Sequence, residues 1–285
     1  MIAFQGLPGA YSDLACRTAY PGTPTLPCPT FEQAIDAVRT GTATLAMLPC
    51  ENSLAGRVPD MHALLPESRL AIIGEHFQRV EHCLLGTPAA SLHTVKRIHS
   101  HAVALGQVRR IIAELNLSAI IEADTAGAAQ QVAAWNNPGD AAIASTLAAE
   151  IYGLQILRRN VEDAPHNTTR FYIAAATPIA LPPETSGLMT TFVFRVRNVP
   201  AALYKALGGF ATNGVNMTRL ESYMLGGQFT ATQFLCDVDG HPEQPALAGA
   251  LEELGFFTTE SRILGTYPQA TFRARSSFAS PTSLG

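Results

Sequence analysis

Pro178-Ile179-Ala180-Leu181-Pro182-Pro183-Glu184-Thr185-Ser186-Gly187 separates two different hydrophobic patterns in this 285-residue chain. Its three prolines and terminal glycine interrupt any helical or strand periodicity, which is typical of a connection between domains. The chain is also longer than one domain usually requires. The sequence therefore predicts two domains, residues 1–178 and 188–270, joined by residues 179–187.

Before this connection, apolar runs rich in β-forming residues alternate with helical stretches. Each helical stretch is opened by Ser, Thr or Asp, or by a turn. We expect strands at residues 2–5, 45–48, 70–77, 82–86, 119–122 and 141–144, and helices at residues 12–20, 31–40, 102–116 and 125–135. This alternation predicts an α/β domain with largely parallel strands.

After the connection, the pattern changes to strand, helix, two strands, helix and strand. We expect strands at residues 190–196, 215–224, 229–237 and 257–264, helices at 200–212 and 245–254, and a turn at Gly226-Gly227. This βαββαβ order matches the ferredoxin-like arrangement, which takes about 80 residues. The Ser-rich remainder, residues 271–285, is predicted to be disordered.

The composition excludes several functional classes. Hydrophobic residues make up 47% and charged residues 15%, which indicates a well-packed globular protein. The net charge is −4 without a block of basic residues, so we expect a small-molecule partner and no nucleic acid. The amino terminus lacks a signal-peptide pattern, and no stretch is long enough to span a bilayer. A cytoplasmic protein without a membrane partner is expected.

Cysteine and histidine give no sign of a disulfide framework or a metal site. The five cysteines are scattered and odd in number, so we expect reduced, mostly buried thiols. His99 and His101 form a tight pair, but no carboxylate or cysteine accompanies them at a spacing that suits zinc. The sequence predicts no metal ligands.

Three polar segments lie at the ends of expected strands or helices in the first domain. Gly6-Leu7-Pro8-Gly9-Ala10-Tyr11-Ser12 can hold a carboxylate on its backbone N–H groups, or Ser12 can simply cap the next helix. Pro49-Cys50-Glu51-Asn52-Ser53 follows the strand at 45–48, at the edge where open α/β sheets bind ligands, although a capped turn would look the same. Ser100-His101 precedes the helix at 102–116. Ser100 is expected to cap it and leave its first amides as an anion site.

Asn167-Thr168-Thr169-Arg170-Phe171 places two hydroxyls, a guanidinium and a ring at the start of a strand. In an ordinary strand, Thr169 and Phe171 would face one side and Thr168 and Arg170 the other. Alone, the segment is compatible with such a strand. With the three other polar segments it predicts a site for an organic acid, because few structural roles need hydroxyl, amide, carboxylate and cationic groups together.

In order and spacing, these segments resemble prephenate dehydratase, a family that converts prephenate to phenylpyruvate in phenylalanine biosynthesis. The resemblance is carried by Gly6-x-x-Gly9-x-Tyr11-Ser12, Pro49-x-Glu51-Asn52-Ser53, Ser100-His101-x-x-Ala104-Leu105 and Thr168-Thr169-Arg170-Phe171. It implies a two-lobed catalytic domain like a periplasmic solute-binding protein, with substrate between the lobes. One lobe would comprise residues 1–75 and 160–178, and the other residues 76–159. The resemblance implies no cofactor.

The resemblance also implies residue roles. Thr169 would be the central catalytic residue, a hydrogen-bond donor to the hydroxyl that leaves prephenate. Glu51 would orient the hydroxyl side, Arg170 would add positive charge, and Asn52, Ser53 and Thr168 would hold carboxylates. The implied substrate-binding residues are Gly9, Tyr11, Ser12, Asn52, Ser53, Ser100, His101, Thr168, Arg170 and Phe171.

The second domain resembles an ACT domain, which in this family binds phenylalanine for feedback inhibition. The usual Gly-Ala-Leu-Val stretch appears as Ala201-Ala202-Leu203-Tyr204, and the usual Glu-Ser-Arg-Pro as Glu221-Ser222-Tyr223-Met224. An ACT domain kept only for dimerisation is the alternative. Pairing of such domains predicts a homodimer or homotetramer. The implied effector-binding residues are Ala202, Leu203, Asn216, Met217, Thr218, Glu221 and Ser222.

Two other functions fit the same sequence. Arogenate dehydratase acts on a substrate with an amino group in place of the keto oxygen, and comparing kcat/KM for the two substrates separates them. A sensor of amino acids or organic acids without catalysis would share the fold. The paired Thr168 and Thr169 favour an enzyme, a carbon–oxygen lyase.

Overall fold

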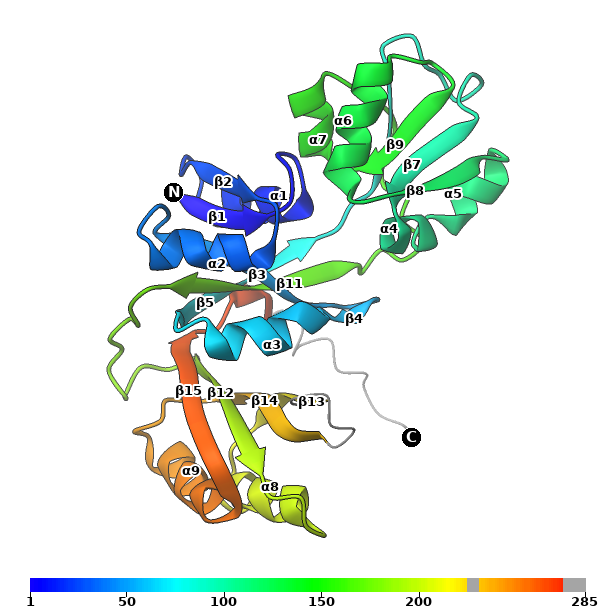
Figure 1. Cartoon of the computed structure of the whole chain (residues 1–285). Helices are drawn as coiled ribbons and strands as arrows, with labels where there is room; N and C mark the ends of the chain where they lie inside the picture. The colour runs from blue at the N-terminus through cyan, green and yellow to red at the C-terminus, as the bar shows by residue number, and fades with distance from the viewer. Residues whose placement is uncertain (225–230, 274–285) are drawn as a thin grey trace. The chain divides into compact units, whose positions relative to one another are not determined.

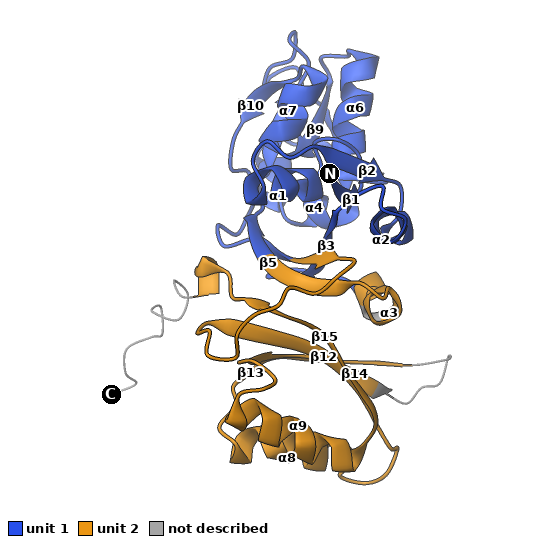
Figure 2. Cartoon of the chain, turned by 90° about the vertical axis from the view of Figure 1, so that its left-hand side faces the viewer, with its two compact units in different colours: residues 1–58, 76–171 blue, residues 59–75, 172–285 orange. Residues whose placement is uncertain are grey.

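The computed structural model describes residues 1–224 and 231–273 (Figure 1). The chain divides into two compact units (Figure 2). Unit 1 comprises Met1–Val58 and His76–Phe171, and unit 2 comprises Pro59–Glu75 and the chain from Tyr172 onward. No helix in the described ranges is long and apolar enough to cross a membrane. The turn expected at Gly226-Gly227 and most of the tail expected at 271–285 lie outside the described residues.

The first lobe of unit 1 is built on a mixed sheet. Its strands are β1 (Ile2–Gln5), β2 (Thr25–Cys28), β3 (Leu45–Asn52), β4 (Gly56–Arg57), β5 (Ala71–Arg79) and β11 (Thr168–Ala175), and its helices are α1 (Tyr11–Ala19) and α2 (Phe31–Arg39). The strand order is β2-β1-β3-β11-β5, and β4 pairs with β3. β1 runs parallel to both neighbours, as the α/β pattern predicts. Only parts of β5 and β11 belong to unit 1, because both strands continue into unit 2.

The second lobe carries a five-stranded sheet in the order β10-β6-β9-β7-β8. Its strands are β6 (Cys83–Gly86), β7 (Arg97–His101), β8 (Ser118–Glu122), β9 (Asp140–Ala144) and β10 (Gln155–Arg158), and its helices are α4 (Ala102–Gly106), α5 (Arg109–Glu114), α6 (Thr125–Trp135) and α7 (Thr146–Tyr152). Successive β9 residues alternate between two cores. Ile143 packs with residues of α4 and α5, and Ala142 with residues of α6 and α7. The expected two-lobed α/β architecture is confirmed.

Two expected boundaries in unit 1 are wrong, for local reasons. β3 continues four residues beyond Leu48 because Glu51 and Asn52 pair with Arg57 and Gly56 of β4. The helix expected at 102–116 is broken into α4 and α5. Asp163 accepts hydrogen bonds from two backbone N–H groups at the start of α5, and its own N–H donates to the Gln107 carbonyl at 2.7 Å. The elements that were not anticipated are β2, β4, β7, β10, α7 and α3 (Pro59–Glu67).

Unit 2 contains the expected βαββαβ order. Its elements are β12 (Leu188–Val196), α8 (Ala202–Thr212), β13 (Met217–Met224), β14 (Ala231–Asp239), α9 (Pro245–Phe257) and β15 (Thr258–Pro268). They form an antiparallel sheet in the order β13-β14-β12-β15. Helices α8 and α9 cover one face of the sheet, where Phe192, Phe210, Phe234 and Leu254 share a buried core (Figure 1).

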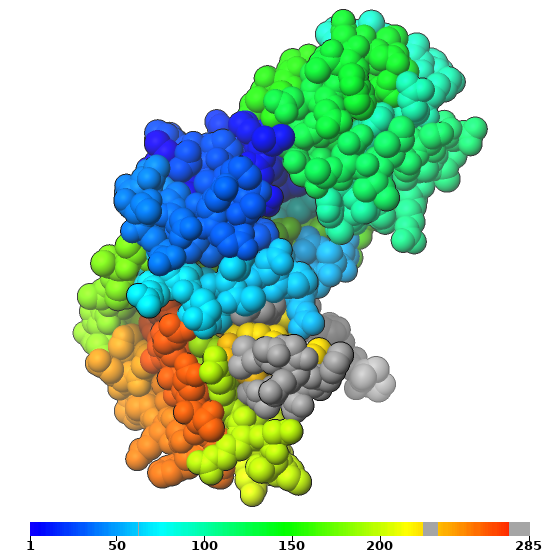
Figure 3. All heavy atoms as spheres, in the orientation of Figure 1, coloured from blue at the N-terminus to red at the C-terminus, as the bar shows by residue number. Residues whose placement is uncertain are grey.

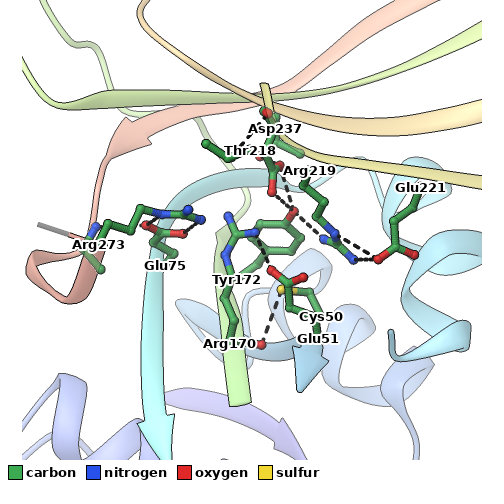
Figure 4. Close-up of polar contacts among 12 residues, drawn as sticks. Cys50, Glu51, Glu75, Arg170, Tyr172, Thr218, Arg219, Glu221, Asp237 and Arg273 are labelled. Carbon is green, nitrogen blue, oxygen red and sulfur yellow. Dashed lines mark hydrogen bonds and ion pairs between the residues drawn. The ribbon is translucent and has the colours of Figure 1, made fainter. Parts of the chain in front are cut away.

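The other face of this sheet is covered by Pro59–Glu75 and by the end of β11, which explains why these segments belong to unit 2. A Cβ at Gly265 of β15 would collide with the Ile72 carbonyl oxygen. The hydroxyl of Tyr172 donates to Asp237 at 2.9 Å and accepts from Arg219 Nη1 at 2.8 Å (Figure 4). These three side chains form a buried polar cluster on the sheet.

Tyr172→Phe is expected to lower the free energy of unfolding by about 1–3 kcal/mol, because the buried Asp237 and Arg219 each lose a hydrogen-bond partner. Chemical denaturation followed by circular dichroism measures this change. Tyr204→Phe is the matched control, since Tyr204 is 81% exposed. Equal stability of the two variants would show that the Tyr172 hydroxyl contributes nothing to the fold.

Ala201 occupies a backbone conformation that suits glycine. It lies at the N-cap of α8 with φ 61° and ψ 15°, in the left-handed region. An alanine side chain is strained there, whereas glycine is not. Ala201→Gly is therefore expected to stabilise the protein by roughly 0.5–1 kcal/mol, after subtraction of the larger unfolded-state entropy of glycine. Thermal unfolding of the variant beside the parent chain tests this, and a lower melting temperature would contradict it.

Candidate functional site

The polar segments that end β3 and begin β11 meet in pairs, because the two strands are neighbours in the first sheet. Asn52 Nδ2 lies 3.0 Å from Thr169 Oγ1, and Glu51 Oε1 lies 2.9 Å from Arg170 Nη1. Successive residues of a strand point to opposite faces. The Asn52–Thr169 pair therefore lies on one face of the sheet and the Glu51–Arg170 pair on the other.

The orientation of the Asn52 amide is fixed by the backbone. Asn52 Oδ1 accepts the N–H groups of Leu54 at 3.0 Å and Ala55 at 2.8 Å. Nδ2 therefore faces the other way, toward Thr169 Oγ1 and, at 2.8 Å, Asn167 Oδ1. An amide nitrogen can only donate. Thr169 Oγ1 is consequently an acceptor from Asn52, and its own proton is left to donate to another group.

The direction of hydrogen-bond donation is fixed in the same way as far as the second lobe. Asn167 Oδ1 accepts a hydrogen bond from Asn52, so its Nδ2 points the other way and donates to Gln107 Oε1 at 2.9 Å. Asn167 is completely buried and Gln107 is half-buried. The sequence pattern gave Asn167 no role of its own and did not indicate Gln107. The signal for Gln107 was its position two residues beyond the Ser100-His101-x-x-Ala104-Leu105 motif.

A cavity of about 450 Å³ adjoins this network in unit 1. Its size is in the range of small-molecule sites. Both lobes contribute to its wall, as expected for a substrate cleft. The lining residues are Leu54, Ala55, Val103, Gly106, Gln107, Asp163 and Ala164.

Asp163 is the carboxylate in the wall of this cavity. Partial burial would raise its pKa, but hydrogen bonds from the Arg110 and Arg109 backbone N–H groups and from the Arg110 side chain outweigh burial, so the pKa of Asp163 is lowered. The carboxylate is therefore ionised at neutral pH and occupied with these donors. It is poorly suited to act as a general acid.

Glu51 and Arg170 lie on the face of the sheet opposite Thr169, and the three residues are outside the lining of the cavity. Arg170 is 2% exposed, its guanidinium donates to Glu51, and it lies over the Phe77 ring (Figure 4). The extension of β3 turns Glu51 to the opposite face of the sheet from Asn52. The direct contacts expected of Glu51 and Arg170 with the substrate stay a prediction. Phe171 is 1% exposed and supports the strand from inside.

Three expected carboxylate-holding groups are engaged within the protein. Ser53 Oγ donates to the His166 carbonyl at 3.0 Å and accepts the Thr168 N–H at 3.0 Å. Thr168 Oγ1 donates to the same carbonyl at 3.2 Å. Asn52 Nδ2 donates to Thr169 Oγ1 and to Asn167 Oδ1. In this arrangement Ser53 joins the two strands and Asn52 orients Thr169. The carboxylate contacts expected of Asn52, Ser53 and Thr168 stay a prediction.

The loop around Gly9 packs the lobes together, and its role as a carboxylate site stays a prediction. The Gly9 N–H donates to Asp13 at 2.9 Å, and a Cβ at Gly9 would lie 2.8 Å from Cα of Ala148 in α7. Ser12 does not cap α1, whose N-cap is Ala10 without a side-chain hydrogen bond. The Tyr11 hydroxyl lies 2.9 Å from His82 Nδ1 and 3.0 Å from the Glu81 carbonyl.

Ser100 and His101 also differ from expectation. Ser100 is completely buried in β7 and donates to the Ile143 carbonyl at 2.7 Å, so it is not the helix cap. His101 is the N-cap of α4, and its Nδ1 accepts the Val103 N–H at 3.3 Å. Within the described ranges, no group of three or more His, Cys, Asp or Glu side chains is arranged to hold a metal ion. All five cysteines are free and buried, as expected.

The expected effector residues lie at the start of α8 and along the edge strand β13. Leu203 and Met217 pack against the same apolar core. Asn216 Nδ2 donates to Asp239 at 2.7 Å, and Thr218 Oγ1 lies 3.4 Å from the Asp237 carbonyl oxygen. Ala202 is nearly buried, Ser222 is exposed, and Glu221 pairs with Arg219 at 3.3 Å.

Comparison with known proteins assigns the chain to a family. The family model described as prephenate dehydratase matches residues 2–178, which include the cavity and the Asn52–Thr169 pair. The chain belongs to the prephenate dehydratase family. It is therefore a hydro-lyase of phenylalanine biosynthesis, and the resemblance found in the sequence is confirmed.

The similarity to known relatives extends over nearly the whole chain. A bifunctional N-acyl-homoserine lactone acylase/prephenate dehydratase from Komagataeibacter europaeus is 66% identical over 96% of this chain and 98% of its own. A chloroplastic arogenate dehydratase/prephenate dehydratase from Arabidopsis thaliana is 37% identical over 95% of this chain and 73% of its own. The prephenate dehydratase from Arthrobacter aurescens, whose crystal structure contains L-Phe, is 30% identical in sequence to this chain. The two structures superpose with a TM-score of 0.86 over 97% of each chain.

Proposed function

We propose that this enzyme converts prephenate to phenylpyruvate, water and carbon dioxide. The observation that carries the proposal is the hydrogen bond from Asn52 to Thr169, beside an inter-lobe cavity in a chain of this family. Because Thr169 accepts from Asn52, its proton is directed to another acceptor. The hydroxyl that leaves the substrate is such an acceptor.

The reaction needs positioning and one well-placed donor. The bond between the ring and its carboxylate breaks, and its electron pair moves through the ring diene. The bond between the ring and the hydroxyl then breaks, which makes the ring aromatic. Hydroxide is a poor leaving group unless it is hydrogen-bonded or protonated. Thr169 supplies this hydrogen bond, and the departing hydroxide takes up a proton to form water.

Gln107 is the residue we assign to a substrate carboxylate. Its Oε1 already accepts from Asn167 Nδ2, so its own Nε2 is the end of the amide available as a donor in the cavity wall. An amide donor gives orientation without the cost of burying a second charge. The two lobes would therefore contribute different functions: Thr169 assists the departure of hydroxide, and Gln107 aligns the acid.

The deciding experiment is phenylpyruvate formation from prephenate by the purified chain, with arogenate run in parallel. A higher kcat/KM for prephenate supports the proposal. A higher kcat/KM for arogenate identifies an arogenate dehydratase, which the Arabidopsis relative's name includes. Absence of turnover with both substrates would favour a sensor.

We further propose feedback by phenylalanine at α8 and β13, in a homodimer or homotetramer. The Arthrobacter relative was crystallised with L-Phe, which supports the ligand. Arg219 of β13 donates to Tyr172, which follows Thr169 by three residues on β11, so the effector strand is bonded to the catalytic strand. Assays with and without phenylalanine test the regulation, and light scattering tests the assembly. Activity unaffected by phenylalanine would leave the domain a pairing module.

Identity of 66% with a bifunctional acylase favours a second activity, hydrolysis of the amide of N-acyl-homoserine lactones. Incubation with such a lactone, followed by mass spectrometry of released homoserine lactone and fatty acid, tests it. Thr169→Val should be included, because loss of both activities would place them at one site. Loss of dehydration alone would place the hydrolysis elsewhere.

A further inference from the structure

His82 and Tyr11 extend the hydrogen-bond network beyond Gln107. His82 Nε2 lies 3.0 Å from Gln107 Oε1, and His82 Nδ1 lies 2.9 Å from the Tyr11 hydroxyl. His82 is 2% exposed, and its ring meets that of Tyr11 edge to face, with centroids 5.4 Å apart. Neither residue lines the cavity. Their connection to the cavity lining runs through Gln107.

The polarity of the network determines the tautomer of His82. Gln107 Oε1 is an acceptor, because Asn167 Nδ2 donates to it. His82 Nε2 must therefore carry a proton. In a neutral imidazole the other nitrogen, Nδ1, then has only a lone pair. The Tyr11 hydroxyl lies 2.9 Å from that lone pair and 3.0 Å from the Glu81 carbonyl oxygen, so in this tautomer its single proton is shared between the two acceptors.

We propose that His82, held in its Nε2–H tautomer by Tyr11, is a positioning residue that fixes the amide orientation of Gln107 and, through Asn167 and Asn52, the direction of the Thr169 proton. This inference rests on the proposed role of Thr169. In this hydrogen-bond network Tyr11 donates to His82, and His82 donates to Gln107 Oε1. Asn167 donates to the same Gln107 oxygen. Asn52 donates to both Asn167 Oδ1 and Thr169 Oγ1. Backbone N–H groups anchor it at the Asn52 end and Tyr11 anchors it at the other.

The opposite tautomer of His82 would change the direction of hydrogen-bond donation in part of this network. A lone pair at Nε2 would face the Gln107 oxygen, which is repulsive. Gln107 would relieve the repulsion by turning its amide, but its nitrogen would then face Asn167 Nδ2, where two donors meet. Turning Asn167 as well would set its nitrogen against Asn52 Nδ2, whose orientation the Leu54 and Ala55 N–H groups fix. The opposite tautomer would suit Tyr11, which could then accept from His82 Nδ1 and donate to the Glu81 carbonyl, but it leaves two like groups facing each other among the three amides. Only the Nε2–H tautomer satisfies Gln107, Asn167 and Asn52 together.

The surroundings of His82 keep the ring neutral. Burial lowers the pKa of His82, and the hydrogen bond to Gln107 and the nearby Glu162 charge only partly offset it. The ionisable groups around the ring are Tyr11 from α1, Cys83 beside it in the chain, and Glu162, whose carboxylate accepts the His82 backbone N–H at 2.9 Å. Burial, with Cys83 and Glu162 as smaller contributors, raises the pKa of Tyr11, so its hydroxyl stays protonated and able to donate.

The test separates the hydrogen bond from the bulk of the ring. His82→Gln keeps a donor toward Gln107, whereas His82→Phe keeps the ring and removes the donor. We expect kcat with prephenate to fall roughly ten- to a hundredfold in His82→Phe, in the range for misplaced catalytic groups, with a smaller change in KM. In His82→Gln we expect most of kcat to return. Equal kcat for the two variants would overturn the proposal.

Tyr11→Phe supplies a readout that loss of packing would not produce. NMR of protein with ¹⁵N-labelled imidazoles should show the His82 Nε2–H tautomer in the parent chain and a mixture of tautomers in Tyr11→Phe, with kcat lowered in proportion. An Nδ1–H tautomer in the parent chain would overturn the proposal. If Thr169→Val is fully active, the proposed function of Thr169 fails. If Thr169→Val is inactive while Tyr11→Phe and His82→Phe are fully active, only the present inference fails.

Discussion

Thr169→Val is expected to lower kcat for dehydration by roughly 10²-fold or more, the range typical of a positioned proton donor. Valine keeps the branched shape of threonine and removes the hydroxyl that accepts from Asn52 at 3.0 Å. The variant loses the hydrogen bond from the Thr169 hydroxyl to the departing hydroxide. This bond strengthens as negative charge develops on the leaving oxygen. A loss confined to the transition state lowers kcat and leaves KM nearly unchanged.

Steady-state kinetics with prephenate measure this result, and Thr169→Ser is the matched control because it restores the hydroxyl on a smaller side chain. Serine should recover most of the lost rate. Thermal unfolding of both variants shows whether either has lost structure. Near-normal turnover by a folded Thr169→Val variant would remove Thr169 from the mechanism and leave the departure of hydroxide to another donor.

The sequence predicted the fold well because the relevant patterns are local. Alternation of apolar strands and helices predicted the α/β lobes, and the second domain has the expected βαββαβ order. The missed elements lack such signals or contradict them. β2 contains Pro27, and α3 carries Pro66 inside it. The helix expected at 102–116 was broken by Asp163, which is distant in sequence, so no local pattern could reveal it.

The segments of the candidate site could be chosen from the sequence, whereas the hydrogen-bond partners of their side chains could not. Segments around Asn52 and Thr169 were expected to converge, and the structure brings them together. Glu51 was expected to orient the hydroxyl side of the substrate, and β3 was expected to end at Leu48. A strand that runs to Asn52 alternates its faces and turns Glu51 away. The direction of each hydrogen bond depends on which groups meet across the sheet and between the lobes, which no single segment of the sequence records.

Asn52→Asp is expected to reduce kcat by roughly 10²-fold or more, although the two side chains have almost the same shape. A carboxylate still accepts the Leu54 and Ala55 N–H groups, so the turn after β3 can form. It cannot donate to Thr169. Thr169 would instead donate its proton to the carboxylate, and that proton would no longer reach the substrate.

Asn116→Asp is the matched control, because Asn116 is an exposed residue of the same unit. Comparing kcat of the two variants separates the loss of the Asn52 donor from the effect of an added negative charge. Asn116→Asp should retain the parent kcat. The Asn52 variant also removes the donor to Asn167 Oδ1, at 2.8 Å in the parent, so the network toward Gln107 loses its anchor. If Asn52→Asp turned over at the parent rate, Thr169 would not need its proton directed away from Asn52, and the derived hydrogen-bond polarity would have no part in catalysis.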